Sequence, residues 1–468
     1  MDKLDIIDTN SKKMLDSSKS IRNFIAELVD ENSFVETDVY MAGDNYIDGT
    51  EALGEGVVTG YAYITGEPVC IIAQNHEVLK GSISVCHAAK IEKTLDRAIK
   101  TGTAVISIIN SNGARLGEGI AVLEGYSKII RKANMLKGVA GHIAVVEGAC
   151  VGLMSAYVNT CDFVYLNAKT GYISLTPPQV VIAKADKMTE PQIALGQESA
   201  KKSPIATYIY NSAKEVCNEI YKLFDLLFSD SEENDDDPNR LSAALNKSCD
   251  VTSLLKAVCD NGKYIELYSQ YAAEIYTVIG SVNGITCGII ATDISRNDGY
   301  ISKNGLIKIN RFLDRLIDAD MPLITLLDSY GIVGSLKEEQ EGISLLASEV
   351  MSKIATFDNT KIAVIVKNAV GYAYSALCSK AIGFDYTLAF CDSYVSSLKA
   401  DTAIEVLAVD EIKKAKDTKK ARENLEKAYV KDAANPYITA KQGFIDNIIE
   451  PAVIRPYIIS ILNMLMSY

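Results

Sequence analysis

Few side chains in this sequence are suited to metal binding or nucleophilic catalysis. The three histidines stand at positions 76, 87 and 142, a spacing that is not typical of a set of metal ligands. The ten cysteines are scattered through apolar segments, and no two form a CxxC pair, so we expect reduced, inert thiols, Cys150 and Cys161 among them. His87 is expected to be a hydrogen-bonded core residue. The sequence therefore predicts no metal site and favours chemistry that uses neither histidine nor cysteine.

Two glycine-containing turns could supply such chemistry through backbone amides. One runs from Gly148 to Met154, and the other is NAVGYAY (368–374); each follows an apolar, strand-like run. Where a turn of this kind enters a helix, successive N–H groups can stabilise an oxygen atom that gains negative charge. A single glycine such as Gly152 more often serves only the turn than a chemical role. The chemical interpretation depends on the recurrence of the turn.

That recurrence is part of a duplication of the whole chain. With a shift of 218 residues, TGEPVCIIA (65–73) falls on NGITCGIIA (283–291) and KIEKTLDRAI (90–99) falls on KINRFLDRLI (308–317). The shift is kept further along, where AVISIINSNG meets PLITLLDSYG and, after one inserted residue, IAVVEGACVG (143–152) meets IAVIVKNAVG (362–371). Chance similarity does not keep one offset over so many segments, so the chain contains two related halves.

Each half alternates short apolar runs with a helical pattern. Val69–Ala73, Val105–Ile109 and Ile143–Val146 read as strands, while Lys90–Lys100 places its apolar residues on one helical face. Strands that alternate with helices predict an α/β fold whose sheets are covered by helices.

The length and the charge distribution predict the domain organisation. With 468 residues, of which 48% are hydrophobic, the chain can form two well-filled cores. The acidic stretch SDSEENDDDPN (229–239) reads as an exposed linker. We therefore expect an N-terminal domain over 1–228, an acidic linker over 229–247 and a C-terminal domain over 248–468.

The overall charge and the N-terminus bear on partners and location. A net charge of −13 disfavours binding to a nucleic-acid backbone. The polar start MDKLDIIDTNSKK lacks the pattern of a secretory or transit peptide, and the apolar runs are too short to cross a bilayer. We expect a cytoplasmic protein that binds no nucleic acid.

Four motifs resemble one family. GEGVVTGYAYITGEPVCIIAQN (54–75), NSNGARLGEG (110–119), VEGACVGLMSAY (146–157) and ANPYITAKQGFIDNIIEP (434–451) are similar to the carboxyltransferase (beta-type) subunits of biotin-dependent acyl-CoA carboxylases and decarboxylases, such as propionyl-CoA carboxylase beta. The resemblance implies two tandem ClpP/crotonase-like domains (ββα superhelix), with acyl-CoA bound mainly by the first and biotin mainly by the second. It implies transfer of a carboxyl group between carboxybiotin and the α-carbon of an acetyl- or propionyl-type acyl-CoA, through an enolate held by backbone amides.

The resemblance also implies the site residues. Gly152 and Leu153 match the amide pair for the enolate, and Tyr372 and Ala373, with Gly371 beside them, match the pair for the ureido oxygen of biotin. Further matches are the CoA-binding loop Asn112, Gly113, Ala114 and Arg115, and Ser375 in the acyl pocket. The sequence leaves two roles open for Arg115, which could pair with a phosphate or with a structural carboxylate such as Glu118.

The cofactors and partners follow from the same resemblance. We expect biotin on a separate carrier protein and a CoA thioester as substrate, without a metal. The expected partners are a biotin carboxyl carrier protein and either a biotin carboxylase or a membrane decarboxylase subunit. The chain is expected to form a homodimer, with a hexamer built as a trimer of dimers as a further possibility.

Several positions depart from the family pattern and keep alternatives open. Asn112, Leu153 and Tyr372 stand where the family has glycines, and Tyr330 stands where it has a proline. These differences are compatible with an altered substrate pocket or with a non-catalytic scaffold subunit. The choice between a carboxylase and a sodium-pumping decarboxylase also stays open.

Overall fold

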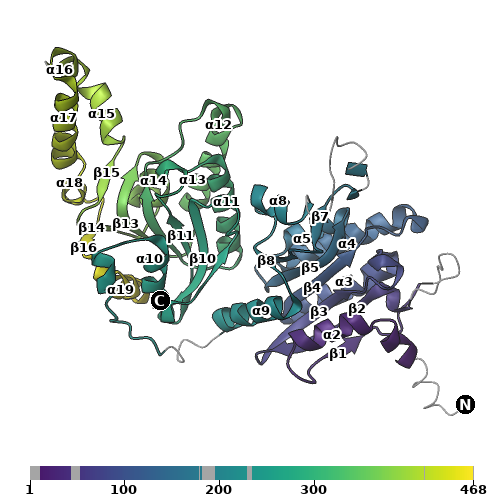
Figure 1. Cartoon of the computed structure of the whole chain (residues 1–468). Helices are drawn as coiled ribbons and strands as arrows, with labels where there is room; N and C mark the ends of the chain where they lie inside the picture. The colour runs from purple at the N-terminus through teal and green to yellow at the C-terminus, as the bar shows by residue number, and fades with distance from the viewer. Residues whose placement is uncertain are drawn as a thin grey trace, which may run out of the picture. The chain divides into compact units, whose positions relative to one another are not determined.

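The computed structural model describes residues 11–43, 53–178, 180–181, 195–228, 235–415 and 417–466. The chain divides into two compact units, Met1–Phe228 and Ser229–Tyr468, each built around its own mixed sheet (Figure 1).

The sheet of the first unit has the strand order β1-β2-β3-β4-β5-β6-β8, with β7 paired to β5. Strands β1 to β3 are antiparallel neighbours, and from β3 onward the pairs are parallel. Their bounds are β1 Val35–Thr37, β2 Val57–Ile64, β3 Glu67–Gln74, β4 Ala104–Ser111, β5 His142–Val151, β6 Phe163–Asn167, β7 Tyr172–Ser174 and β8 Tyr208–Tyr210. The strands predicted at 69–73, 105–109 and 143–146 are confirmed inside β3, β4 and β5.

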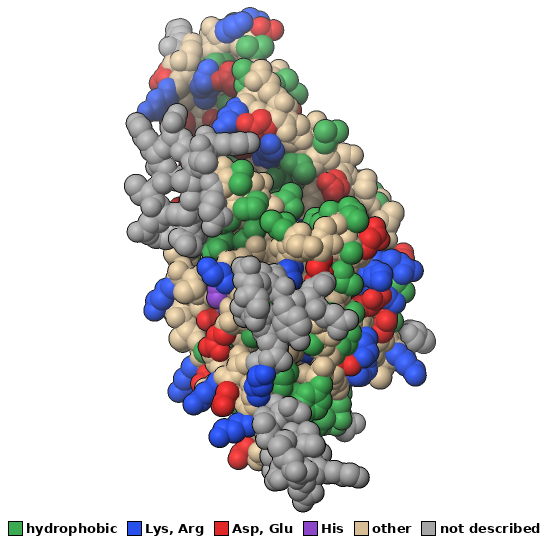
Figure 2. Space-filling view, turned by 90° about the vertical axis from the view of Figure 1, so that its right-hand side faces the viewer, with side chains coloured by type: hydrophobic (Ala, Val, Ile, Leu, Met, Phe, Trp, Pro, Cys, Tyr) green, Lys and Arg blue, Asp and Glu red, His purple; other side chains and the backbone are tan. Residues whose placement is uncertain are grey.

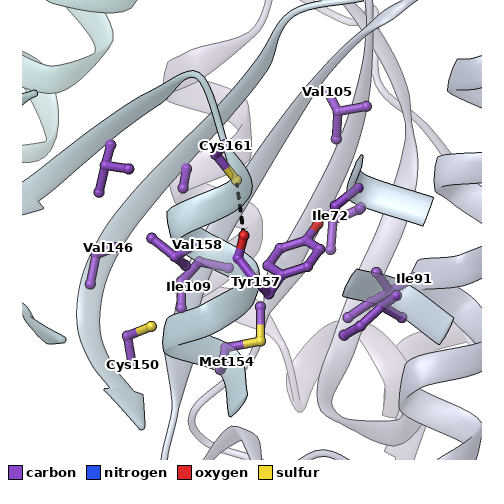
Figure 3. Packing of buried hydrophobic residues seen from close by; sticks show 14 of the residues in the cluster. Ile72, Ile91, Val105, Ile109, Val146, Cys150, Met154, Tyr157, Val158 and Cys161 are labelled. Carbon is purple, nitrogen blue, oxygen red and sulfur yellow. Dashed lines mark hydrogen bonds between the residues drawn. The ribbon is translucent and has the colours of Figure 1, made fainter. Parts of the chain in front are cut away.

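Helices pack their apolar faces on this sheet because the buried strands are apolar on both faces. The predicted helix at 90–100 is confirmed as part of α3 (Val85–Thr101), which packs against α4 (Ile120–Leu136). Met154, Tyr157 and Val158 of the short helix α5 (Leu153–Thr160) belong to the hydrophobic core of this unit, together with buried residues of α3 and α4 (Figure 3). Further helices in the described part of this unit are α2 Lys19–Leu28, α8 Gln197–Lys202 and α9 Ala213–Phe228.

The second unit repeats this arrangement. Its sheet has the order β16-β14-β13-β12-β11-β10-β9, with β15 paired to β13. The bounds are β9 Tyr264–Leu267, β10 Ile275–Val282, β11 Ile285–Thr292, β12 Leu323–Ser329, β13 Lys361–Val370, β14 Tyr386–Phe390, β15 Tyr394–Ser396 and β16 Asn447–Ile449. The β4–β5 pair shifts register between Ile109 and Ser111, and the β12–β13 pair shifts between Leu327 and Ser329, which are the equivalent positions. The predicted duplication is therefore confirmed down to an irregularity in the strand pairing.

The helices of the second unit include an arm that has no counterpart among the described residues of the first. Helices α10 Val251–Val258, α11 Lys303–Asp318, α14 Tyr372–Leu377 and α19 Ile454–Met466 pack on the sheet. Helix α13 Ile343–Ala355 packs against α11 and α14, and the short α12 Leu336–Gln340 contacts α13. Helices α15 Ala400–Leu407, α16 Val409–Lys414 and α17 Thr418–Ala433 project from the sheet before the chain returns through α18 Pro436–Lys441 (Figure 1).

The acidic stretch predicted as exposed, residues 229–239, is exposed at four of its five described positions, and only Asp236 packs on the second unit. Residues 229–234 lie outside the described residues. Asp236 is mostly buried and pairs with Arg240 at 2.8 Å and with Arg455 at 3.4 Å. Arg455 is itself fully buried and bonds Asp260 at 2.6 Å and the Val258 carbonyl at 2.7 Å. Composition alone did not reveal the pairing of Asp236, because the buried Arg455 lies 219 residues away in the sequence.

We predict that Arg455→Met destabilises the second unit by about 3–5 kcal/mol, since it leaves Asp260 buried without its cation. Arg240→Met is the matched control, because that side chain is 31% exposed and its ion pair contributes about 1 kcal/mol or less. Urea unfolding followed by far-ultraviolet circular dichroism measures both. Equal losses in the two variants would contradict the importance of the buried pair.

Candidate functional site

The turn at Gly152 joins the end of β5 to helix α5 with a backbone conformation that only glycine adopts readily. Its φ is +69° and its ψ is −142°. Its N–H donates to the Ser174 carbonyl at 2.9 Å, and its own carbonyl accepts from the Ser155 amide at 3.0 Å. Within the described part of the chain, the N–H groups of Leu153 and Met154 have no hydrogen-bond acceptor. The turn thus presents two neighbouring amides to an incoming acceptor.

The turn at Gly371 repeats this construction in the second unit. Gly371 has φ +52°, donates its N–H to the Ser396 carbonyl at 2.9 Å and accepts from the Ser375 amide at 3.1 Å. The amides of Tyr372 and Ala373 have no acceptor among the residues that the structure describes. The equivalent pair in the first unit is Leu153 and Met154.

This comparison revises one sequence-based assignment. The sequence prediction named Gly152 and Leu153 as donors, but the amide of Gly152 is already bonded to Ser174. The geometry retains Leu153 and replaces Gly152 by Met154 as its neighbour. Gly152 is left with the role of shaping the turn.

The departures from the family glycines cause no backbone strain. In the described residues the left-handed conformation falls on the retained glycines of both turns, and neither Leu153 nor Tyr372 has a positive φ. The Tyr372 hydroxyl donates to the Ala347 carbonyl of α13 at 2.9 Å, which anchors the second turn to that helix. Leu153 is half-buried and packs against the core of the first unit. Both bulky side chains therefore have defined contacts.

The loop after β4 lies beside the first turn. Gly113, with φ +103°, comes close to the end of β5, since a Cβ on it would lie 3.6 Å from the Val151 carbonyl. Ala114 forms a bridge with Ile83, and Asn112 is exposed. Gly331, with φ +101°, occupies the equivalent place in the second unit, where a Cβ would lie 4.0 Å from the Tyr372 amide nitrogen. Each turn thus has a glycine loop as its neighbour.

Arg115 serves the fold rather than a free anion. Its guanidinium is buried and donates to Glu55 at 2.7 Å and to the Ser82 carbonyl at 3.3 Å, while Glu118 lies 3.8 Å away. Burial raises the pKa of Glu55, but hydrogen bonds from the Gly43 amide, Ser84 and Arg115 outweigh it, so the pKa is lowered overall. Of the two roles left open by the sequence, the geometry selects the structural carboxylate and corrects the phosphate contact.

A buried chain of neutral groups, which the sequence did not reveal, connects the strand ends around the first turn. The His87 ring bonds the Glu55 carbonyl at 2.8 Å through Nδ1 and the Gln74 amide nitrogen at 3.3 Å through Nε2. The Glu55 carbonyl can only accept, so Nδ1 carries the proton and Nε2 accepts. Gln74 accepts from the Asn110 amide at 3.1 Å, and the Asn110 side chain accepts from the Ala149 amide at 3.1 Å. The sequence signal that could have pointed to this network is the presence of polar residues at the ends of apolar strands.

A second buried cluster fixes the helix that follows the turn. The Tyr157 hydroxyl of α5 lies 2.9 Å from the Ser107 hydroxyl on β4, which lies 3.0 Å from Nε2 of His142 on β5. Tyr157 is surrounded by apolar side chains that include Ile72 and Ile91 (Figure 3). Both histidines are therefore structural, as expected for His87.

Ser375 lies half-buried in α14, one turn after Gly371. A cavity of about 910 Å³ in the second unit lies elsewhere, at the ends of β11, β12 and β13, with Asp293, Asp328 and Lys367 in its wall. No residue predicted for the site lines this cavity.

The histidine network predicts a pH dependence of stability. Burial lowers the pKa of His87 to about 3, below the ordinary value of 6.5 that applies in the unfolded chain. Between about pH 6 and pH 4 the unfolded state binds a proton at His87 that the folded state excludes, so His87 lowers the stability by roughly 1.4 kcal/mol for each unit that the pH falls. Burial also lowers the pKa of His142 to about 3, so that residue contributes an equal slope. His87→Asn should therefore remove about half of the slope that the two histidines give, whereas the exposed His76→Asn should leave the slope unchanged. Urea unfolding across this range measures the difference, and parallel curves for the wild type and His87→Asn would contradict the assignment.

Comparisons with known proteins identify the family of the chain. The model of the carboxyl transferase domain matches residues 16–468. Methylmalonyl-CoA decarboxylase subunit alpha from Veillonella parvula is 31% identical, over 97% of this chain and 92% of that protein. The mitochondrial propionyl-CoA carboxylase beta chain from Mus musculus is 30% identical, over 95% of this chain and 85% of its own length.

A solved structure gives the same result in three dimensions. The transcarboxylase 12S structure, a hexamer assembly with methylmalonyl-coenzyme A bound, superposes with a TM-score of 0.89 at 26% identity. The superposition covers 97% of this chain and 92% of that one. The predicted fold and the predicted resemblance are thereby confirmed, and the chain belongs to the carboxyl transferase family.

Proposed function

We propose that this chain transfers a carboxyl group between biotin on a separate carrier protein and the α-carbon of a short acyl-CoA. Its family and its relatives, which include propionyl-CoA carboxylase beta chains and methylmalonyl-CoA decarboxylase alpha subunits, support this reaction class. The observation that carries the proposal is the pair of equivalent turns, each with two amides that have no acceptor within the described residues.

The first unit would hold the acyl-CoA. Removal of a proton from the α-carbon places negative charge on the thioester oxygen, and that charge needs donors that are already in position. The amides of Leu153 and Met154 fit this need because Gly152 fixes their direction and Tyr157 fixes the helix behind them. The exposed Asn112 and the glycine loop after it are the proposed neighbours of the CoA.

The second unit would hold biotin. A ureido oxygen is an acceptor for two N–H groups, and Tyr372 and Ala373 offer two neighbouring amides at a turn. When bound, carboxylated biotin supplies the carboxyl group. Ser375, on the same helix, is proposed to line the acyl pocket.

The partners and assembly are part of the same proposal. The reaction requires a biotin carboxyl carrier protein, together with a biotin carboxylase or a membrane decarboxylase subunit. Leu116 and Ile120 are 86% and 74% exposed on the first unit, and such side chains fit an interface with a second copy of the chain. Hydrophobic side chains also gather in patches on the face drawn in Figure 2. No helix in the described ranges is long and apolar enough to cross a membrane.

A decarboxylase is the second candidate function. Methylmalonyl-CoA decarboxylase alpha subunits from two bacteria match 97% of this chain at 29% and 31% identity. The same amide pairs serve that direction, because the enolate is common to both. A purely scaffolding role is disfavoured by the retained glycines and unstrained turns.

The transfer reaction is tested with the purified full-length chain, a biotinylated carrier protein and carboxyl-labelled methylmalonyl-CoA or malonyl-CoA. We expect label to appear on the carrier. Absence of label on the carrier, together with absence of carboxylated product when carboxylated carrier and propionyl-CoA or acetyl-CoA are supplied, would refute the proposed function.

We predict that Gly152→Ala lowers kcat by about 10²–10³-fold, the loss typical of removing one oxyanion donor, because alanine disfavours the positive φ that aims both amides. Leu153→Gly is the matched control, since it leaves the backbone donors in place and should reduce kcat far less. Steady-state kinetics of carboxyl transfer measures both variants. Similar kcat values for Gly152→Ala and the wild type would contradict the role of the turn.

A further inference from the structure

The two glycine turns differ in one charged side chain close by. In each unit a serine carbonyl accepts the N–H of the turn glycine, Ser174 in the first and Ser396 in the second. Three residues after that serine stands Pro177 in the first unit and Lys399 in the second. The duplication therefore provides an internal comparison, in which a cation accompanies the second turn alone at this position.

The side chain of Lys399 has a defined set of contacts. Its Nζ lies 4.6 Å from the centre of the Tyr330 ring, a distance typical of a cation–π contact. The Tyr330 ring in turn packs on Tyr300, with ring centres 5.8 Å apart, and on Gly299, where a Cβ would lie 2.8 Å from the ring. Asp401 lies 3.4 Å from Nζ, yet the Lys399 side chain is still 38% exposed. The ammonium is thus held in place without being enclosed.

The loop that carries Tyr330, the contact of Lys399, adjoins the turn at Gly371. Gly331 follows Tyr330 directly, and a Cβ on Gly331 would lie 3.0 Å from the Val370 carbonyl and 4.0 Å from the Tyr372 amide nitrogen. From the other side, β15 pairs with the end of β13 and leads into Lys399. Two segments distant in sequence, one ending at Gly331 and one following β15, therefore meet next to the turn, and Lys399 contacts the ring of Tyr330 where they meet.

A cation beside one turn and a proline beside the other suits two ligands of different charge. An amide pair alone matches a ligand with one oxygen that gains charge, as in a thioester. Biotin in its carboxylated form offers the ureido oxygen and a separate carboxylate. Resting on the proposed function, we propose that Lys399, seated on Tyr330, binds the carboxylate that biotin carries.

The strength of this contact is limited by its setting. A half-exposed ammonium that also pairs with Asp401 binds a carboxylate modestly. A modest contact suits the reaction, because a carboxylate held too tightly in the ground state would slow its own departure. We expect the contact with Lys399 to tighten binding of the carboxylate by about five- to tenfold. This is more than an exposed ion pair contributes and less than a buried charge-assisted hydrogen bond contributes.

Binding is tested by titration calorimetry of the full-length chain with two stable probes. One is biotin amide with a carboxymethyl group on the ureido nitrogen, and the other is its uncharged N-methyl counterpart. The wild type should bind the charged probe about five- to tenfold more tightly, as should Lys399→Arg and Tyr330→Phe, which keep the cation or the ring. Lys399→Met should reduce the preference to within about twofold.

Asp401→Asn makes the test independent of any loss of folding in Lys399→Met. It removes the competing carboxylate and should increase the preference for the charged probe. The proposal is overturned if Lys399→Met keeps the wild-type preference, if Asp401→Asn lowers it, or if the wild type binds both probes equally or neither. A wild type that transfers carboxyl groups but shows no charge preference refutes the role of Lys399 alone, whereas absence of transfer refutes the proposed function.

Discussion

The geometry of both candidate sites depends on one backbone constraint, a glycine with positive φ at the point where a long strand turns into a short helix. At Gly152 and Gly371 this conformation directs the glycine amide back to a serine carbonyl and leaves the next two amides without an acceptor in the described chain. A residue with a Cβ disfavours that conformation, whereas the following positions accept any side chain except proline. The glycine is therefore the fixed element, and the neighbouring residues are free to vary.

The two turns share their backbone geometry and differ in the side chains around them. In the first unit, Gln74, His87 and Asn110 form a neutral buried network under the turn. In the second unit, Tyr372 bonds α13, and Tyr330 seats the cation of Lys399. The common part is backbone and the differing part is side chain, which is the division that the proposed binding of two different ligands requires.

Periodicity and the internal offset were sufficient to predict the strands, the α/β class and the duplication, because these depend on local pattern and on self-similarity. The pairing of Arg115 with Glu55 and the docking of Asp236 on Arg455 were not predictable, since each depends on residues far apart in sequence. The shift of the donor pair from Gly152 and Leu153 to Leu153 and Met154 depends on a single hydrogen bond to Ser174. A motif match cannot reveal such a bond, because it identifies positions and not the direction of an N–H.

The central claim is that backbone amides of the first turn hold the thioester oxygen. Difference infrared spectroscopy of propionyl-CoA labelled with ¹³C at its carbonyl tests it most directly, because hydrogen bonds to that oxygen weaken the C=O bond. The account predicts a lower carbonyl frequency for the bound thioester than for the same thioester in water, and a return toward the solution value in Gly152→Ala. A bound thioester whose carbonyl frequency equals the solution value in the wild type would contradict the account.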